Sequence, residues 1–462
     1  MIYNPKYLTP FILAMSVSAW SIVANADDEK QLGGPVLTAF GAEKAGNKEG
    51  TIPAYTGEGL KIPAGFGKDP KDPYSRPDPF ANEKPLYSIT AQNAAQYADK
   101  LDGLVEIFKT YPNFRMDVYP THRSTVFPQY MLDNTLKNAK DCKSVDNDTL
   151  IENCWGGIPF PVPQNGAQVM WNHLTAFRGH AWQGYSNSYV VATNGTVSNV
   201  GGNRLWQQSP YYDPKATAPA VGKTVYWAFR ADADAPTRKV GEKLVIVDPL
   251  DVKNIGRRAY QYIPGQRRVK LSPDLAYDTP SPSGGGSATM DDALAFSGAL
   301  DRYDFKLVGK KEKLIMANNF KIYDRAGCDD ARIVSTKNFP NPDCIRWELR
   351  RVWTVEAKLK PGFRHVYPRR MFYWDEDGYA TGLAENYDAA NKLYRVVSLH
   401  GVPYYTEEEG GMVAEGTFNL DLQTGVWSVQ GVHGNVGAGA AKSSPKPDNF
   451  FSSEGLTGAG IR

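Results

Sequence analysis

From about residue 168 onward, apolar and polar side chains alternate along much of the chain, which is the two-residue period of β-strands. Turn-forming pairs such as Asn194-Gly195 and Pro264-Gly265 separate these runs, so neighbouring strands are expected to be antiparallel. The expected strands cover residues 185–193, 225–230, 244–248, 257–263, 267–271, 345–359, 365–374, 393–399 and 416–432. The pattern therefore predicts a mainly β protein with a meander of antiparallel strands.

A helical period occurs in two places. Residues 91–110 carry apolar side chains at three- and four-residue steps, and Thr90 precedes them as a capping residue. A shorter helix is expected over residues 290–300, after Thr289. A glycine- and serine-rich stretch precedes this helix, and such a segment fixes little backbone by packing. Residues 279–300 are therefore a candidate lid.

The chain divides into three parts. Residues 1–26 have the form of a cleaved secretory signal, with Lys6, an apolar run and the peptidase pattern Ala24-Asn25-Ala26. A membrane anchor is the alternative, but the run is short, is broken by Pro10 and leads straight into acidic residues. Residues 27–88 form an irregular N-terminal arm, and residues 89–462 are expected to form a single β domain.

The four cysteines lie in two local pairs, Cys142 with Cys154 and Cys328 with Cys344. Neither pair has the spacing of a zinc site, so no metal is expected. Export into an oxidising compartment favours disulfides within each local pair, although four cysteines allow two other pairings.

Composition and charge exclude several classes of protein. Lys plus Arg is 52 and Asp plus Glu is 50, so the basic excess typical of a nucleic-acid-binding protein is missing. Aromatic residues make up 12% of the chain, which argues against a disordered protein. Past the N-terminus no apolar run reaches the length of a membrane-spanning helix.

Enzyme motifs do not stand out. The sequence has no G-x-S-x-G, no H-E-x-x-H and no phosphate-binding loop, and its six histidines are scattered. The acidic run Asp375-Glu376-Asp377-Gly378 lacks the ligand spacing of a calcium loop and is interpreted as a hairpin turn. No catalytic residue, cofactor or metal ligand is assigned.

Aromatic side chains supply the candidate binding surface. Ten Trp and twenty-six Tyr are concentrated on the alternating strands, where residues two apart share a face. If the sheet is curved, its concave face would collect several of these pairs around an apolar ligand, whereas a plain hydrophobic core is the alternative. The candidate ligand-binding residues are Trp227, Phe229, Tyr260, Tyr262, Trp347, Trp353, Phe372 and Trp374.

Adjacent arginines recur on the expected strands, for example Arg350-Arg351 and Arg369-Arg370. Neighbours on a strand point to opposite faces, so each pair places one guanidinium on each side of the sheet. Ion pairs with strand carboxylates are one interpretation, and contact with anionic head groups is the other. The candidates for these roles are Arg267, Arg268, Arg351 and Arg370.

Several segments resemble a Gram-negative exported family of unknown function, whose members are often labelled as outer-membrane lipoprotein-sorting-like. These segments are LTAFGA at 37–42, AGN at 45–47, GTIPA at 50–54, YPTHR at 119–123, PGQRRV at 264–269, WELRRVW at 347–353 and RHVY at 364–367. The resemblance implies a large curved antiparallel sheet, or half-open β-barrel, with a few helices over its concave face, as in the lipoprotein carriers LolA and LolB.

The resemblance also implies a function. We expect a periplasmic protein, at most peripheral to the outer membrane, that binds and transfers a lipid or another apolar small molecule. An outer-membrane protein and an exporter of the resistance-nodulation-division type are the expected partners. A hydrolase acting on an apolar ester and a structural adaptor of an envelope exporter are the alternatives.

Overall fold

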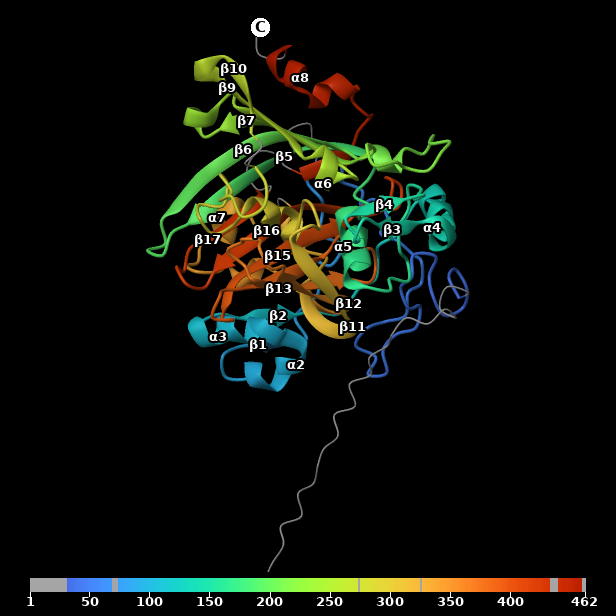
Figure 1. Ribbon diagram of the computed structural model, residues 1–462. Helices are drawn as coiled ribbons and strands as arrows, with labels where there is room; N and C mark the ends of the chain where they lie inside the picture. The colour runs from blue at the N-terminus through green and yellow to red at the C-terminus, as the bar shows by residue number, and fades with distance from the viewer. Residues whose placement is uncertain (1–30, 69–73, 273–274, 325, 433–438, 459–462) are drawn as a thin grey trace, which may run out of the picture.

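The computed structural model describes residues 31–68, 74–272, 275–324, 326–432 and 439–458. Sixteen strands form one large sheet in the order β1-β2-β12-β13-β14-β15-β16-β17-β5-β6-β7-β8-β9-β10, with β11 beside β12 and β18 beside β5. All its strand pairs are antiparallel except a single parallel pairing of β2 with β12. The sheet is curved and not closed (Figure 1). The predicted fold class is confirmed.

The strands of the sheet are β1 (Tyr87–Ile89), β2 (Met116–Val118), β5 (Ala181–Val191), β6 (Val197–Gln208), β7 (Val225–Ala235), β8 (Lys243–Pro249), β9 (Arg258–Ile263), β10 (Arg268–Leu271), β11 (Tyr303–Met316), β12 (Trp347–Leu359), β13 (Arg369–Asp375), β14 (Gly382–Tyr387), β15 (Leu393–Pro403), β16 (Met412–Asp421), β17 (Trp427–Val432) and β18 (Gly439–Lys442). A separate hairpin pairs β3 (Lys143–Val145) with β4 (Leu150–Glu152).

The helices are short. The α-helices are α2 (Ala98–Leu101), α3 (Val105–Thr110), α4 (Gln129–Asp141), α5 (Gly166–Leu174), α6 (Val252–Ile255), α7 (Asp330–Ile333) and α8 (Ser453–Gly458). The 3-10 turns are η1 (Ala94–Tyr97), η2 (Asp102–Leu104), η3 (Pro210–Tyr212), η4 (Thr237–Lys239), η5 (Pro264–Gln266), η6 (Met290–Ala295), η7 (Phe320–Ile322), η8 (Pro342–Cys344) and η9 (Asp448–Phe451).

The helix expected over residues 91–110 is divided into η1, α2, η2 and α3. The break falls at Asp102, whose φ of 49° lies outside the helical region. The Asp102 carboxylate binds Lys311 at 2.6 Å and Lys313 at 3.0 Å, both on β11. Tertiary ion pairs therefore interrupt a segment whose apolar period alone predicts a continuous helix.

Part of one face of the sheet, called the inner face here, is covered by α5. This helix packs against β11 and β12, and all but one of its residues are buried. His173 of α5 stacks on Trp374 of β13 with ring centroids 3.5 Å apart. A short helix that is buried on almost all sides, with Asn172 and His173 among its buried residues, lacks the one-sided apolar stripe that predicts a surface helix, so the sequence pattern did not predict it.

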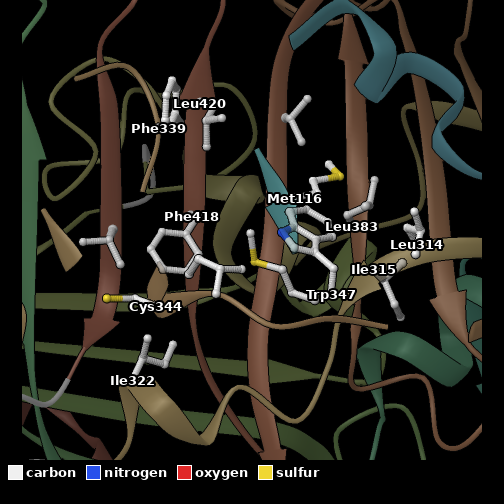
Figure 2. Close-up of a cluster of buried hydrophobic side chains, with 14 of the residues drawn as sticks. Met116, Leu314, Ile315, Ile322, Phe339, Cys344, Trp347, Leu383, Phe418 and Leu420 are labelled. Carbon is white, nitrogen blue, oxygen red and sulfur yellow. The ribbon is translucent and has the colours of Figure 1, made fainter. Parts of the chain in front are cut away.

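The opposite face of β12 to β17 is covered by the N-terminal helices and by residues between β11 and β12. Figure 2 shows this cluster, in which Trp347 lies near Met116, Ile315 and Leu383. The cluster also contains both cysteines of the disulfide Cys328–Cys344.

The two predicted disulfides, Cys142–Cys154 and Cys328–Cys344, are present. In the described part of the chain, no helix combines the length and the apolar character that crossing a bilayer requires. The expected signal at 1–26 lies outside the described residues.

Candidate functional site

A cavity of about 250 Å³ lies on the inner face of strands β5 to β9. Residues paired across these strands form rows that point into it. One row is Trp182, Gln207, Phe229 and Ile246, and the next contains Leu205, Ala231, Leu244 and Gln261. The two-residue period of the strands thus supplies an apolar wall with a few polar positions.

Trp227 and Phe229 form the aromatic part of this wall. Their rings stack with centroids 5.6 Å apart and an interplanar angle of 24°. The Trp227 indole nitrogen donates a hydrogen bond of 2.8 Å to Oε1 of Gln207, which satisfies its one polar atom. With that atom satisfied, Trp227 contributes apolar surface to the cavity lining, although Phe229 and the guanidinium of Arg257 contact its ring.

Residues 275–300, called the strap here, cross the cavity and contain the candidate lid. The strap residues in the lining are Leu275, Ser281, Pro282, Ser283, Thr289, Met290, Ala293 and Leu294. At one end of the cavity Trp227 and Met290 are buried, whereas at the other Pro282 is exposed and Lys239 and Glu242 are half-buried. The mouth therefore lies between the strap and the connection from β7 to β8.

The strap is firmly attached to the sheet. Asp291 and Asp292 are buried and form ion pairs of 2.9 Å with Arg370 of β13. Burial raises the pKa of Asp291, but Arg370 and His365 outweigh it and lower that pKa to about 2. The carboxylate therefore stays ionised and bound at neutral pH.

The glycine-rich part of the strap is also closely packed. A Cβ on Gly285, whose φ is 55°, would lie 2.7 Å from Val190 of β5. The hydroxyl of Ser287 donates a hydrogen bond of 2.8 Å to Ser428 of β17. These contacts hold residues 284–287 against the sheet, so movement of the candidate lid, which stays a prediction, would have to break them.

Three other candidate aromatics lie on the inner face but outside the cavity. Trp353, Phe372 and Trp374 stand on adjacent strands β12 and β13, with Trp353 paired opposite Trp374. All three are buried in a hydrophobic cluster that includes α5. The structure therefore places them in the hydrophobic core between the sheet and α5.

Trp347, Tyr260 and Tyr262 lie elsewhere. Trp347 belongs to the cluster in Figure 2, separate from that of Trp353. Tyr260 and Tyr262 flank Gln261, and because Gln261 points into the cavity the two tyrosines lie on the outer face. There they pack in a small cluster with residues of the C-terminal segment.

The four candidate arginines divide into two groups. Arg370 is fully buried, and the largely buried Arg351 binds Glu43 at 2.8 Å and Glu376 at 3.2 Å. These two form structural ion pairs. Arg267 and Arg268 are exposed at the turn between β9 and β10.

A buried ion network near the end of β13 was missed by the sequence analysis. The acidic run interpreted as a turn does connect β13 to β14, but its side chains point inward: Asp377 binds Arg123 at 2.6 Å and Arg350 at 2.8 Å. Burial raises the pKa of Asp375 to about 6 despite Arg350. Arg123 and Arg350 belong to two of the segments that carry the family resemblance, which was the available signal.

Buried histidines are occupied by structural contacts. His173 bonds the carbonyl oxygens of Tyr379 and Phe296, and His365 lies 3.0 Å from Asp291. The cavity lining contains serine and threonine hydroxyls but no histidine among the described residues. No group of three side chains that could hold a metal ion occurs among the residues that the structure describes.

Comparison with known proteins gives a family. Residues 88–457 match the family model described as protein of unknown function, DUF1329. An uncharacterized protein of Pseudomonas aeruginosa is 37% identical over 415 residues, which cover 88% of this chain and 89% of that protein.

Three solved structures are similar at 12–13% identity. A domain named provisionally for outer membrane lipoprotein sorting, from Vibrio parahaemolyticus, has a TM-score of 0.43 and covers 63% of this chain and 98% of its own. A DUF1329 family protein from Desulfovibrio piger has a TM-score of 0.41 with 62% and 95% covered, and a LolA superfamily protein from Nitrosomonas europaea has 0.35 with 62% and 97%. From the family match over most of its length, the chain belongs to the DUF1329 family, which confirms the resemblance found in the sequence.

Proposed function

We propose that this protein binds a compact apolar molecule, a lipid or a similar compound, in the cavity beneath the strap and transfers it without chemical change. The single observation that carries the proposal is the apolar wall around Trp227 and Phe229 on the inner face of an open sheet. Burial of apolar ligand surface there would supply about 25 cal/mol per Å².

The size of the cavity limits the ligand. A volume of about 250 Å³ is near the lower end for small-molecule sites. It suits one acyl chain or a compact ring system better than the several chains of a lipoprotein anchor. A larger ligand would require the strap to move.

The proposed location is the periplasm, after removal of residues 1–26. Two disulfides support an oxidising compartment, because such bonds are rare in the cytosol. Detection of the protein in a periplasmic fraction, with the mass of a chain whose first residue is Asp27, would test this. Association with an outer-membrane protein and a resistance-nodulation-division exporter stays a prediction from the resemblance, testable by crosslinking in the envelope.

Binding is tested with the apolar fluorophore N-phenylnaphthylamine. We expect Trp227→Ala to weaken probe binding at least tenfold, because it removes one side of the aromatic wall. Trp206→Ala is the matched control: Trp206 lies on β6 but faces the outer side, where it packs on Phe450. Equal affinity of wild type and Trp227→Ala would contradict the proposed site.

The natural ligand requires a separate measurement. Protein purified from the periplasm without detergent is extracted with organic solvent, and the extract is analysed by mass spectrometry. An apolar compound present with wild type and depleted with Trp227→Ala would identify it.

A further inference from the structure

Five basic side chains lie on two neighbouring turns, one of which forms a side of the cavity mouth. Arg238 and Lys239 lie in η4, between β7 and β8, and Arg267, Arg268 and Lys270 lie on the hairpin of β9 and β10. These five residues are called the basic rim here. The two turns touch, since a Cβ on Gly241 would lie 3.0 Å from Pro264.

The rim is an excess of charge rather than a set of ion pairs. Arg238, Arg267, Arg268 and Lys270 are exposed, and none of them forms an ion pair with another described residue. Residues 258–271 contain four basic residues and no acid. Of the nearby carboxylates, those of Asp232 and Asp234 are already bound by Arg230 and Arg204, and Glu242 alone leaves the five basic residues in excess.

An apolar side chain is exposed within the same surface: Val240, directly after Lys239, is 52% exposed. Leu271, at the far end of β10, is 56% exposed, but it is paired with Tyr260 and lies on the other face of the hairpin from Lys270. Exposed apolar residues among basic ones are the combination that binds the interface of an anionic bilayer. A basic surface without apolar side chains would interact with head groups alone.

The rim also has a defined position relative to the cavity. Lys239 contributes to both, since it lines the cavity and its Nζ donates a hydrogen bond of 2.8 Å to the carbonyl of Val200. On the next pair of strands, Lys243 of β8 is paired with Tyr262 of β9, which places the turn end of the hairpin beside the cavity wall. A surface that contacts the rim would therefore face the mouth.

We propose that the basic rim docks the protein on a membrane surface that contains anionic lipids, with the cavity mouth turned towards that surface. Each basic side chain near such a surface strengthens binding by about fivefold, and salt weakens the attraction. This goes beyond the proposed function, because docking requires no ligand in the cavity.

The test is flotation of the full chain with vesicles of phosphatidylcholine, with and without phosphatidylglycerol. We expect wild type to bind the phosphatidylglycerol vesicles, and Arg267→Glu/Arg268→Glu to lower that binding at least tenfold. The matched control, Lys84→Glu/Lys140→Glu, makes the same change in net charge at two exposed positions. Lys84 lies just before β1, at the opposite end of the strand order, and Lys140 lies in α4. The control is expected to bind like wild type.

Three results would overturn the docking surface: equal binding by the rim variant and wild type, an equal loss in the control, or wild-type binding that does not depend on phosphatidylglycerol. Affinity for N-phenylnaphthylamine without vesicles should be the same in the rim variant and wild type. Vesicle binding by a wild type that binds no probe would reject the proposed function and leave the docking surface standing.

Discussion

Arg370 on β13 and Asp291 on the strap form an ion pair of 2.9 Å in which neither side chain is more than 4% exposed. Arg370 also donates to Asp292 at 2.9 Å and to the amide oxygen of Asn386 at 2.8 Å. The guanidinium therefore ties the segment over the cavity to a central strand of the sheet. A pair this deeply buried depends on both partners, because either charge alone would lie in an apolar environment.

Replacing Arg370 with Met should destabilise the protein by about 3–5 kcal/mol, since Asp291 and Asp292 would lose their shared counterion. Urea unfolding measures the loss. Arg369→Met is the matched control, because Arg369 is adjacent but partly exposed and binds Glu356, a pair worth at most about 1 kcal/mol. Similar losses in both variants would show that the buried pair has no special role in attaching the strap.

Trp347 should behave as a core residue rather than as part of the ligand site. It is 3% exposed, and Figure 2 shows it among Met116, Leu314, Ile315 and Leu383. We expect Trp347→Ala to cost about 3–5 kcal/mol of unfolding free energy. Binding of N-phenylnaphthylamine by the folded fraction should be unchanged, and a large loss of probe affinity without loss of stability would contradict this.

The strand meander could be predicted because successive side chains of most strands point to opposite sides of the sheet, which leaves an alternating pattern in the sequence. β11 escaped prediction for a physical reason: its lysines Lys310, Lys311 and Lys313 point to both faces and find carboxylates there, so no apolar alternation is left in the middle of the strand. A charged strand at the edge of a sheet is also what prevents pairing with another chain.

The candidate site was only partly predictable for the same kind of reason. Alternation places Trp227 with Phe229 and Tyr260 with Tyr262, but it does not say which pair faces inward. The pairing of Leu244 with Gln261 decides this, and it depends on the register between β8 and β9. The ion pairs of the strap join residues more than seventy positions apart, so no local pattern reveals them.

Stability should fall as the solution becomes acidic, because His400 is buried in its neutral form. Its Nε2 lies 2.8 Å from the carbonyl oxygen of Gln430, and its Nδ1 lies 3.0 Å from the hydroxyl of Tyr323. Burial lowers the pKa of His400 from 6.5 to about 4. The unfolded chain therefore takes up a proton first as the pH falls below 6.5, which favours unfolding.

From this shift, His400 should account for about 2 kcal/mol of the stability lost between pH 7 and pH 5. Urea unfolding at the two pH values measures it. His400→Gln keeps a donor and an acceptor but cannot titrate, so its loss over this interval should be smaller than that of wild type by this amount. The buried His173, whose pKa is lowered to about 3 by burial, is retained in both proteins. An identical loss in wild type and variant would show that His400 does not titrate in this way.

Arg178 should be a source of instability. Its side chain is buried, Nη1 donates one long hydrogen bond of 3.4 Å to the carbonyl of Ala176, and neither Nε nor Nη2 has a partner among the described residues. No carboxylate in that part of the chain pairs with it, and burial lowers its pKa to about 10, so it is still charged at pH 7. An unsatisfied buried polar group costs about 1–3 kcal/mol.

Arg178→Met keeps the length of the side chain without the charge, and we expect it to raise the unfolding free energy by about that amount. Arg230→Met is the comparison, because Arg230 is also buried but binds Asp232 at 2.8 Å, and its loss should destabilise the protein. If urea unfolding showed that Arg178→Met is the less stable protein, the guanidinium would have to be satisfied in solution by a bound group.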